Sequence, residues 1–348
     1  MTSPSFADAV NAALSDAMAE NPQTLFFGLG ATDPKRIFGT ATELVERFGA
    51  KRVFDMPTSE NGMTGVAIGA ALMGFHPIMV HQRLDFFLLA MDQLVNGAAK
   101  WHYMFGGGDA VPLTIRLIMG RGWGQGPTHS QNLQAWFAHV PGLKVVMPAT
   151  VQDAYGLLLA AIRDPNPVLV LEHRWLHAQQ GDFARTAVPL GSAQVLRAGS
   201  DVTLVGMSYM SLEALRAAEF LAGHGISAEV VDLRTVSPID WPTIEASVRK
   251  TGRLVALDTA DEVCCIAGHV VATCVQRLFS TLKAAPIVVA SPHCPVPTSV
   301  ALTKCFYPGA SQIVEAVART LGQTIPASAD RLDIEPHDVP GPWFKGPF

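Results

Sequence analysis

Short, unbroken apolar runs alternate with longer helical stretches along most of this chain. In the first part the apolar runs are TLFFGLG, HPIMVH, VPLTIRLIMG, LKVVMP and PVLVLEH. Strands that are apolar on both faces and separated by helices are typical of a parallel sheet covered on both sides. The pattern therefore predicts a doubly wound α/β domain, which we assign to residues 1–176.

A polar stretch with Gly and Pro interrupts the alternation at residues 177–194, HAQQGDFARTAVPLGSAQ, and predicts a linker. A second alternation follows, with DVTLVGMS, SAEVVDLR, GRLVALD and PIVVAS as its strands, and predicts a smaller α/β domain over residues 195–322. Residues 323–348 are rich in Pro and lack helical or strand periodicity, so we expect a tail. A length of 348 residues suits two such domains.

Composition and charge exclude several classes of function. The chain is 49% hydrophobic and 16% charged, which favours large contacts with other subunits, including a second copy of itself. A formal net charge of -5 without a basic block argues against nucleic-acid binding. No apolar run reaches the roughly 18 residues of a membrane span, and the start does not resemble a signal peptide. We therefore expect a soluble cytoplasmic protein. Its five cysteines form no CxxC pair, which favours free thiols.

One acid stands out in the stretch FDMPTSENGMTGVAIGAALMG. Glu60 follows a proline turn and precedes a helix in which Gly62, Gly65 and Gly69 strip one face of side chains, so that a second backbone could approach closely. The helix dipole favours the carboxylate of such a residue, whereas burial favours the neutral acid, so its protonation state is tunable. The local pattern alone favours a simpler interpretation, a helix-start acid without chemistry.

A second constellation lies in RGWGQGPTHSQNLQAWF. A Gly-rich loop from Gly120 to Gly126 leads to His129 and then to a helix that contains Trp136 and Phe137. A histidine at the end of such a loop is well placed for proton transfer to a bound substrate, although a capping or simply exposed histidine would fit the same spacing. The chain lacks a GxGxxG motif after its first strand, a P-loop, a GxSxG elbow and an HExxH motif.

Taken in order, these segments resemble one known family. They are, in particular, FGAKRVFDMPTSENGMTGVAIGAALMGFHPI, DFFLLAMDQLVNGAAKWHYMFGG, GPTHSQNLQAWFAHVPGLKVVMPATVQDAYGLLLAAIRDPNPVLVLEH and AEVVDLRTVSPIDWPTIEASVRKTGRLVALD. From about residue 5 to residue 321 the chain resembles the beta subunit of the thiamine diphosphate-dependent decarboxylase component of 2-oxo acid dehydrogenase complexes. The resemblance implies a pyrimidine-binding domain followed by a transketolase C-terminal-like domain.

The resemblance implies roles for individual residues. Glu60 would hydrogen-bond the pyrimidine nitrogen of thiamine diphosphate, which favours the tautomer that removes the thiazolium proton, and this requires shielding from water. Phe86 would stack on the pyrimidine, and Gln82 would lie beside the cofactor. His129 would assist the reaction of the substrate-derived intermediate and its transfer to a lipoyl group.

The resemblance also implies metals and partners. Carbonyl groups of a tight turn and a nearby strand match a site for a monovalent cation such as K+, formed by Leu113, Ala161, Ile162, Asp164 and Asn166. Mg2+ would be bound elsewhere, because this chain has no GDG motif. The family pattern places that half of the cofactor site on a separate alpha subunit, usually in a heterotetramer that has a beta–beta contact, and a lipoyl acyltransferase would accept the product.

Two segments depart from the family pattern. HQRLD, residues 81–85, replaces mostly apolar positions, so that Arg83 could bind a carboxylate or phosphate of the substrate, or could instead contact the alpha chain. Arg121 in the Gly-rich loop is a second candidate for substrate binding. These departures leave open a two-component transketolase-like synthase that passes the carbanion to an aldehyde, in place of oxidative decarboxylation with acyl transfer. A non-catalytic assembly or regulatory subunit and a generic α/β binding protein are the remaining alternatives.

Overall fold

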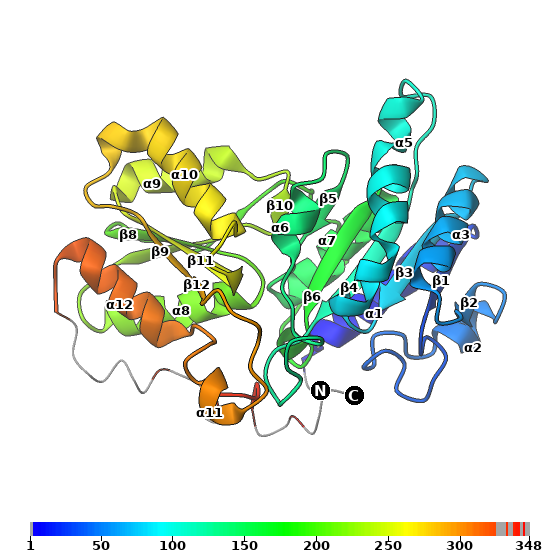
Figure 1. Cartoon of the computed structure of the whole chain (residues 1–348), viewed down its shortest axis with the longest axis horizontal. Helices are drawn as coiled ribbons and strands as arrows, with labels where there is room; N and C mark the ends of the chain where they lie inside the picture. Colours follow the sequence, from blue (N-terminus) through cyan, green and yellow to red (C-terminus); the bar gives the residue numbers. More distant parts are fainter. Residues whose placement is uncertain (1–2, 325–331, 333–336, 342–343, 345–348) are drawn as a thin grey trace. The chain divides into compact units, whose positions relative to one another are not determined.

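The computed structural model describes residues 3–324, 332, 337–341 and 344 and divides into two compact units (Figure 1). Of these residues, unit 1 contains 3–120 and 136–190, and unit 2 contains 121–135 together with the residues from 191 onward. The linear division of the sequence placed residues 121–135 in the first domain. In the structure this segment packs with the second unit.

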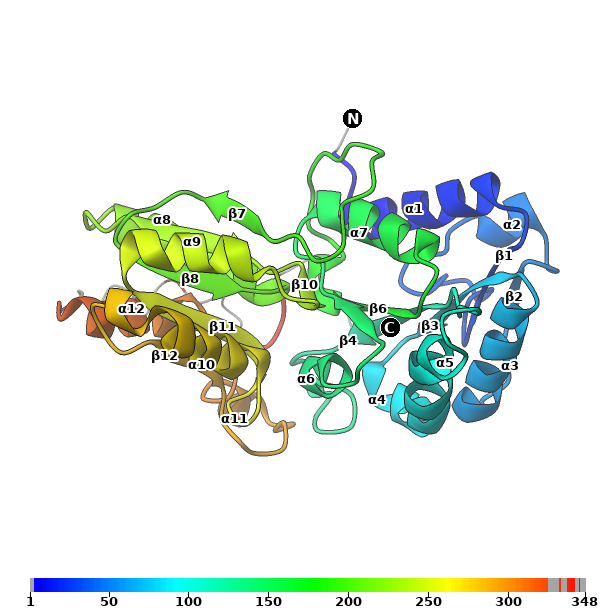
Figure 2. The same cartoon turned by 90° about the horizontal axis from the view of Figure 1, so that it is seen from above.

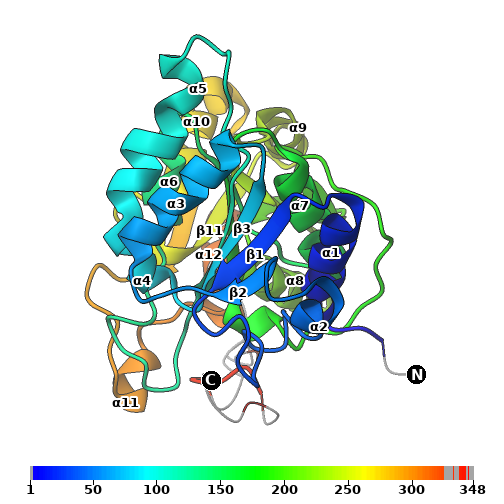
Figure 3. The same ribbon diagram turned by 90° about the vertical axis from the view of Figure 1, so that its right-hand side faces the viewer.

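Unit 1 is a parallel sheet with helices on both faces. Its strands are β1 (Thr24–Gly28), β2 (Val53–Asp55), β3 (His76–His81), β4 (Thr114–Met119), β5 (Lys144–Val146) and β6 (Val168–His173), in the order β5-β6-β4-β3-β1-β2. Its helices are α1 (Phe6–Glu20), α2 (Leu44–Phe48), α3 (Glu60–Leu72), α4 (Leu84–Phe87), α5 (Ala99–Met104) and α7 (Val151–Arg163), with a 3-10 turn at Leu88–Ala90, a π-helical turn at Gln93–Ala98 and a 3-10 turn at Arg174–Leu176. Figure 3 shows α1 and α7 on one face and α3 and α5 on the other.

Local sequence explains where these helices begin. Ser5 caps α1, because its hydroxyl accepts the Asp8 N–H at 3.1 Å while the Asp8 carboxylate accepts the Ser5 N–H at 2.8 Å. Thr150 caps α7 in the same way through the Asp153 N–H. The two helices then pack against each other along their apolar faces. They cover the side of the sheet opposite to Glu60.

Unit 2 is a smaller sheet sandwiched between two pairs of helices. Its strands are β7 (Gln194–Arg197), β8 (Val202–Gly206), β9 (Ala228–Asp232), β11 (Leu254–Asp261) and β12 (Ile287–Ser291), in the order β12-β11-β8-β9-β7; all pairs are parallel except the edge pair β7–β9. Helices α8 (Tyr209–Ala222) and α12 (Ala310–Leu321) cover one face, and α9 (Trp241–Thr251) and α10 (Ile266–Leu278) cover the other (Figure 1); Figure 2 looks from above onto α9 and α10. Unit 2 also contains β10 (Thr235–Ser237), a 3-10 turn at Phe279–Thr281 and α11 (Val300–Thr303), and the short helix α6 (Gln134–Ala138) begins in unit 2 and ends in unit 1.

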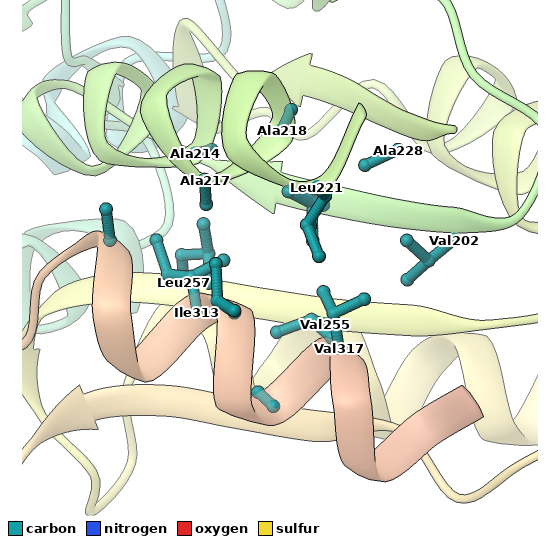
Figure 4. Close-up of a cluster of buried hydrophobic side chains, with 14 of the residues drawn as sticks. Val202, Ala214, Ala217, Ala218, Leu221, Ala228, Val255, Leu257, Ile313 and Val317 are labelled. Atoms are coloured by element: carbon teal, nitrogen blue, oxygen red, sulfur yellow. The ribbon is translucent and has the colours of Figure 1, made fainter. Parts of the chain in front are cut away.

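The core of unit 2 is built mainly from alanine and aliphatic side chains. Figure 4 shows Ala214, Ala217 and Leu221 of α8 facing Ile313 and Val317 of α12 over β11. Small side chains on α8 allow the two helices to lie close together while the larger ones fill the space between them. Each unit therefore has its own core, and the predicted architecture of two doubly wound α/β domains is confirmed.

Two further features concern the chain as a whole. No helix in the described part is long and apolar enough to cross a membrane. All five cysteines are free thiols, and Cys265 and Cys274 are buried. Burial raises the pKa of both buried thiols to about 11, so they remain protonated and unreactive at neutral pH.

Candidate active site

Three neighbouring strands of unit 1 end side by side. Gly28 at the end of β1 is paired with Asp55 of β2 on one side and with Val80 of β3 on the other. The carboxyl edge of a parallel sheet is where ligands of such folds usually bind, because the loops that follow the strands converge there. Glu60 follows β2, and Gln82 follows β3. The fold therefore brings the cofactor-binding candidates of unit 1 to the same edge.

Glu60 is the first residue of α3, and its side chain is 5% exposed. Its backbone carbonyl accepts the Thr64 hydroxyl at 2.7 Å, which fixes the first turn of the helix. Within the described residues no protein group hydrogen-bonds or ion-pairs with its carboxylate. Buried polar groups in native proteins almost always have a partner. A carboxyl group in this situation is therefore suited to a ligand that carries a hydrogen-bonding nitrogen.

Within the part of the chain that the structure describes, no other backbone covers Gly65 or Gly69 on the glycine face of α3. A Cβ atom added at Gly69 would have no heavy atom within 4 Å, and one added at Gly65 would first meet the Gln93 side chain at 3.5 Å. Val66, on the same helix, is 59% exposed, and Met73 at its end is 80% exposed. The close packing that the glycines suggested therefore has no partner within the described chain, and the face is open to a second molecule.

Gln82 lines a cavity of about 360 Å³. Its amide Nε2 donates to the Leu29 carbonyl at 3.0 Å and lies so close to Gly30 that an added Cβ there would be only 2.4 Å away. Gly30 also has a φ of +77°, so glycine is required at this position for both reasons. The cavity is lined by Asp33, Pro34, Lys35, Ile37, Phe38 and Gln82.

Phe86 lies on the short helix α4 and is 41% exposed, whereas Leu84, Asp85 and Phe87 on the same helix are buried. A large aromatic ring that its neighbours leave accessible is suited to stacking on a flat heterocycle. Phe87 instead packs on His81, with ring centroids 4.9 Å apart. The sequence pattern LDFF thus divides its two rings between the core and the surface.

Arg83 is oriented into unit 1. Its side chain is 1% exposed, its Nη1 donates to the Gln82 carbonyl at 2.7 Å, and its Cζ lies 5.5 Å from the centre of the Phe38 ring. Arg174 approaches the same ring at 4.5 Å. Burial lowers the pKa of Arg83 to about 10, and the nearby Asp85 charge acts in the opposite direction. The structure thus places Arg83 against Phe38 and the backbone that carries Gln82, where it fixes this segment.

His129 ends the Gly-rich loop of unit 2. Its N–H donates to the Gly126 carbonyl at 3.4 Å, and its Nδ1 lies 3.0 Å from the Thr128 hydroxyl. Four loop residues have a positive φ, namely Gly122, Trp123, Gly124 and Gly126. The loop then leads into α6, as the sequence predicted. The imidazole is half-buried and is part of a tightly wound segment, an arrangement that suits proton transfer.

Arg121 begins this loop and is held by aromatic rings. Its Cζ lies 4.4 Å from the centre of the Tyr307 ring and 5.2 Å from that of Tyr209. The Tyr307 hydroxyl also accepts the Gly122 N–H at 2.9 Å. Guanidinium groups bind aromatic faces through cation–π attraction. In the described structure Arg121 therefore anchors the His129 loop to unit 2.

Gln134 anchors the other end of the loop, and sequence reasoning missed it. Its amide donates to Asp258 at 2.5 Å and to the Thr259 hydroxyl at 3.2 Å, and Asp258 also accepts the Ala267 N–H. Burial raises the pKa of Asp258, although its backbone and Gln134 hydrogen bonds oppose this shift. A Gln at the start of a predicted helix gives no signal of a contact with a strand more than a hundred residues later.

The turn proposed to hold a monovalent cation is ordered by protein groups. The Leu113 carbonyl accepts the Val168 N–H, and the Ala161 carbonyl accepts both the Thr114 hydroxyl and the Asp164 N–H. Lys144 forms an ion pair with Asp164 at 2.5 Å. Among the described residues there is no cluster of three or more His, Cys, Asp or Glu side chains that could hold a metal. The cation site itself, which also includes Ile162 and Asn166, stays a prediction.

Comparison with known proteins identifies the class of protein. The family model for the transketolase pyrimidine-binding domain matches residues 2–179, and the model for the transketolase C-terminal domain matches residues 191–313. The chain therefore belongs to the transketolase-like, thiamine diphosphate-dependent family. The solved structure of a split-gene transketolase, an inactive beta4 tetramer, shares the fold with a TM-score of 0.76 at 22% identity, over 93% of this chain and 100% of that one.

Curated relatives define the branch of this family. The beta subunit of acetoin:2,6-dichlorophenolindophenol oxidoreductase from Cupriavidus necator is 41% identical over 90% of this chain and 96% of its own length. The pyruvate dehydrogenase E1 component subunit beta of Rhizobium meliloti is 38% identical over 88% of this chain and 68% of its own. The mitochondrial pyruvate dehydrogenase E1 component subunit beta-2 from Oryza sativa subsp. japonica is 37% identical over 92% of this chain and 87% of its own length. The chain thus belongs with the beta subunits of 2-oxo acid dehydrogenases, and the predicted resemblance is confirmed.

Proposed function

We propose that this chain is the beta subunit of a two-chain thiamine diphosphate enzyme that decarboxylates a 2-oxo acid and passes the acyl group to a lipoyl domain. The observation that carries the proposal is the Glu60 carboxyl group, which is buried at the start of α3 and has no protein partner among the described residues. Such a group, placed at the carboxyl edge of the sheet, fits the pyrimidine ring of the cofactor. Bound thiamine diphosphate would supply the nucleophilic carbon that attacks the 2-oxo acid.

The residues of unit 1 have distinct roles in this proposal. Glu60 shares a proton with the pyrimidine nitrogen, and its burial keeps water from competing for that proton. Phe86 offers its accessible ring for stacking. Gln82, tied to Leu29, defines the wall of the cavity beside the cofactor, and Arg83 keeps the Gln82 backbone in place.

His129 of unit 2 acts as the proton donor or acceptor during acyl transfer. Its imidazole is half-buried beside the Thr128 hydroxyl, which can orient the ring. Arg121 contributes by holding the loop between Tyr209 and Tyr307. In this form of the proposal the two arginines shape the site, and the direct clamping of a substrate carboxylate is not required of them.

The partners follow from what the chain lacks and what it exposes. Without a GDG motif, the diphosphate and its Mg2+ would be bound by an alpha subunit. Exposed apolar side chains that could meet that subunit or a second copy of this chain lie on or directly after α3 and α5 and in the turn at Leu88–Ala90: they are Val66, Met73, Leu89, Tyr103, Met104 and Phe105. Exposed large apolar side chains are typical of a subunit interface. K+ at the Asp164 turn, the lipoyl acyltransferase and a cytoplasmic location belong to the proposal in the same way.

The structure disfavours the alternative in which the carbon fragment goes to an aldehyde. That alternative depended on polar residues at 81–85, yet His81 is 3% and Arg83 is 1% exposed, so neither offers a surface for an acceptor. A purely structural subunit is disfavoured by Glu60, because a buried carboxyl without a partner destabilises a chain that makes no use of it.

The test is an acceptor screen with the purified complex of this chain and its co-expressed alpha partner. Decarboxylation of a panel of 2-oxo acids is followed first with a dye as electron acceptor and then with a free lipoyl domain or with aldehydes. We expect turnover with the lipoyl domain, and loss of turnover in Glu60→Gln but not in the exposed control Glu43→Gln. Product formation only with aldehydes would favour the synthase, and equal activity in Glu60→Gln would remove the catalytic role.

A further inference from the structure

The described part of the C-terminal segment lies against the Gly-rich loop that carries His129. The Trp123 N–H donates to the Asp338 carbonyl at 2.9 Å, and the Trp123 ring meets Phe344 edge-on at 5.9 Å. At Gly122, an added Cβ would lie 2.4 Å from the Asp338 carbonyl oxygen and 2.8 Å from its carboxylate. Two consecutive loop residues are therefore in direct contact with residues more than two hundred positions later.

This segment is itself fixed within unit 2. The His337 Nε2 lies 3.0 Å from both the Thr303 hydroxyl and the Val300 carbonyl of α11 (Figure 1), and the Asp338 side chain is 4% exposed. We refer to residues 337–341 together with Phe344 as the C-terminal brace. Because Tyr307 accepts the Gly122 N–H from another direction, the start of the loop is held at several points.

The loop needs such support because of its own sequence. Glycines leave a backbone free to adopt many conformations, and this freedom must be lost when the loop is ordered. Trp123 has a φ of +56°, a left-handed conformation that is disfavoured for a residue with a large side chain. The Trp123 N–H bond to Asp338 and the ring contact with Phe344 both act at this residue. They therefore stabilise the loop where its backbone is most strained.

The brace lies outside the residues that the two family models match. The C-terminal family model ends at residue 313, before the brace begins. The contacts at Gly122, Trp123 and Asp338 thus attach a segment beyond the matched residues to the loop that carries His129. A loop that is ordered in advance presents its catalytic group without an entropic penalty at each turnover.

We propose that the C-terminal brace fixes the Gly-rich loop in the conformation that presents His129, with Asp338 as a positioning residue. The consequence for catalysis depends on the proposed function, since it concerns the acyl-transfer step assigned to His129. The structural part of the proposal does not depend on it. Loss of the brace loosens the loop and slows acyl transfer, while Glu60 and cofactor affinity are unaffected.

The structural test compares two alanine substitutions in the full chain by hydrogen exchange. Gly122→Ala and Gly124→Ala have nearly the same backbone penalty, because the φ values are +64° and +69°. Only the first collides with Asp338, since the nearest atom to a Cβ at Gly124 is 3.9 Å away. We expect exchange in the brace peptide to accelerate about tenfold in Gly122→Ala and to stay unchanged in Gly124→Ala. Equal protection of the brace in both variants would overturn the proposal.

A chain that ends after Thr324 and the variant Phe344→Ala provide the second arm. In both variants the Trp123 amide should exchange faster than in the unaltered chain. In the shortened chain, where the collision partner is gone, Gly122→Ala should increase the exchange rate of the loop no more than Gly124→Ala does. Unchanged protection of the loop in the shortened chain would contradict the proposal that the brace fixes the loop.

The catalytic test uses the shortened chain and Phe344→Ala in the complex with the alpha partner. In both, acyl transfer to the lipoyl domain should fall at least tenfold while the Kd for thiamine diphosphate is retained. Transfer at the full rate in both would overturn the positioning role. If the unaltered complex fails to bind the cofactor, the proposed function fails and the exchange results still decide the brace.

Discussion

Arg116 and Glu172 form a fully buried ion pair on the neighbouring strands β4 and β6. The Nε–Oε1 distance is 2.6 Å, the Nη2–Oε2 distance is 2.8 Å, and both side chains have no exposed surface. Arg116 also donates to the Thr40 hydroxyl at 3.1 Å, and His177 lies 3.5 Å from the same carboxylate. The pair ties the centre of the sheet in unit 1 to the segment that precedes α2.

Removal of one partner of this pair should be strongly destabilising. Arg116→Met leaves the Glu172 carboxylate buried without its main counterion, and we expect a loss of about 3–5 kcal/mol in the free energy of unfolding. The control is Arg163→Met, which breaks an exposed pair with Glu20 and should cost less than about 1 kcal/mol. Urea unfolding of both variants measures the difference. Similar losses in the two variants would contradict the role of burial.

Acid should destabilise unit 1 through His81. Burial lowers the pKa of His81 from 6.5 to about 3, so the folded protein keeps this imidazole neutral. Below pH 6.5 the imidazole of His81 binds a proton in the unfolded chain but not in the folded chain. The contribution of His81 to the free energy of unfolding is therefore fully present above pH 6.5 and decreases as the pH falls toward 3. His177, whose pKa burial lowers to about 4, contributes in the same direction.

The variant His81→Phe tests this explanation, because a phenyl ring can keep the contact with Phe87 and does not titrate. We expect the free energy of unfolding to depend less steeply on pH between 6.5 and 4 than in the unaltered chain. A pH profile of His81→Phe that runs parallel to that of the unaltered chain would show that His81 does not titrate in this way.

Gly30 should be essential for the cavity wall that we propose to lie beside the cofactor. Alanine there adopts a left-handed backbone and collides with the Gln82 amide at 2.4 Å, which should displace Gln82 from Leu29. We expect Gly30→Ala to weaken thiamine diphosphate binding by the complex at least tenfold. Gly39→Ala has a similar φ of +84° but no neighbour within 4 Å, so it shares the backbone strain alone. Equal affinities in the two variants would argue against a role for Gln82.

The accessible ring of Phe86 should contribute to cofactor affinity by stacking. Phe86→Ala removes a contact worth about 1 kcal/mol, which corresponds to a roughly fivefold higher Kd for thiamine diphosphate. Leu89→Ala removes a neighbouring side chain that is 68% exposed, and it should change this Kd little. Calorimetric titration of each complex provides the values. A larger increase in this Kd for Leu89→Ala than for Phe86→Ala would show that Phe86 does not make the stacking contact.

The sequence predicted the parts of this structure that depend on local pattern. Apolar runs such as residues 24–30 identify buried parallel strands, because both faces of each strand must avoid water. Its position between a proline turn and a glycine-rich helix identified Glu60 as a candidate site residue. The resemblance supplied its chemistry, and the structure added that the carboxyl group is buried.

Contacts between distant residues were beyond such reasoning. The sequence offers Arg121 as a candidate for substrate binding, and only the fold shows that its guanidinium lies against the rings of Tyr209 and Tyr307. Likewise, no periodicity indicates that Asp338, in a Pro-rich tail, lies against Gly122. These contacts join segments whose sequences carry no mutual signal, so three-dimensional packing decides them.

The measurement that tests the central claim most directly is the rate at which the thiazolium C2 proton of bound thiamine diphosphate exchanges with deuterium. It is compared by NMR in the complex with its alpha partner, for the unaltered chain and for Glu60→Gln. If the buried Glu60 carboxyl activates the cofactor, the variant should bind thiamine diphosphate yet exchange this proton at least a hundredfold more slowly. Exchange at an unchanged rate, with the cofactor bound, would contradict this account of Glu60.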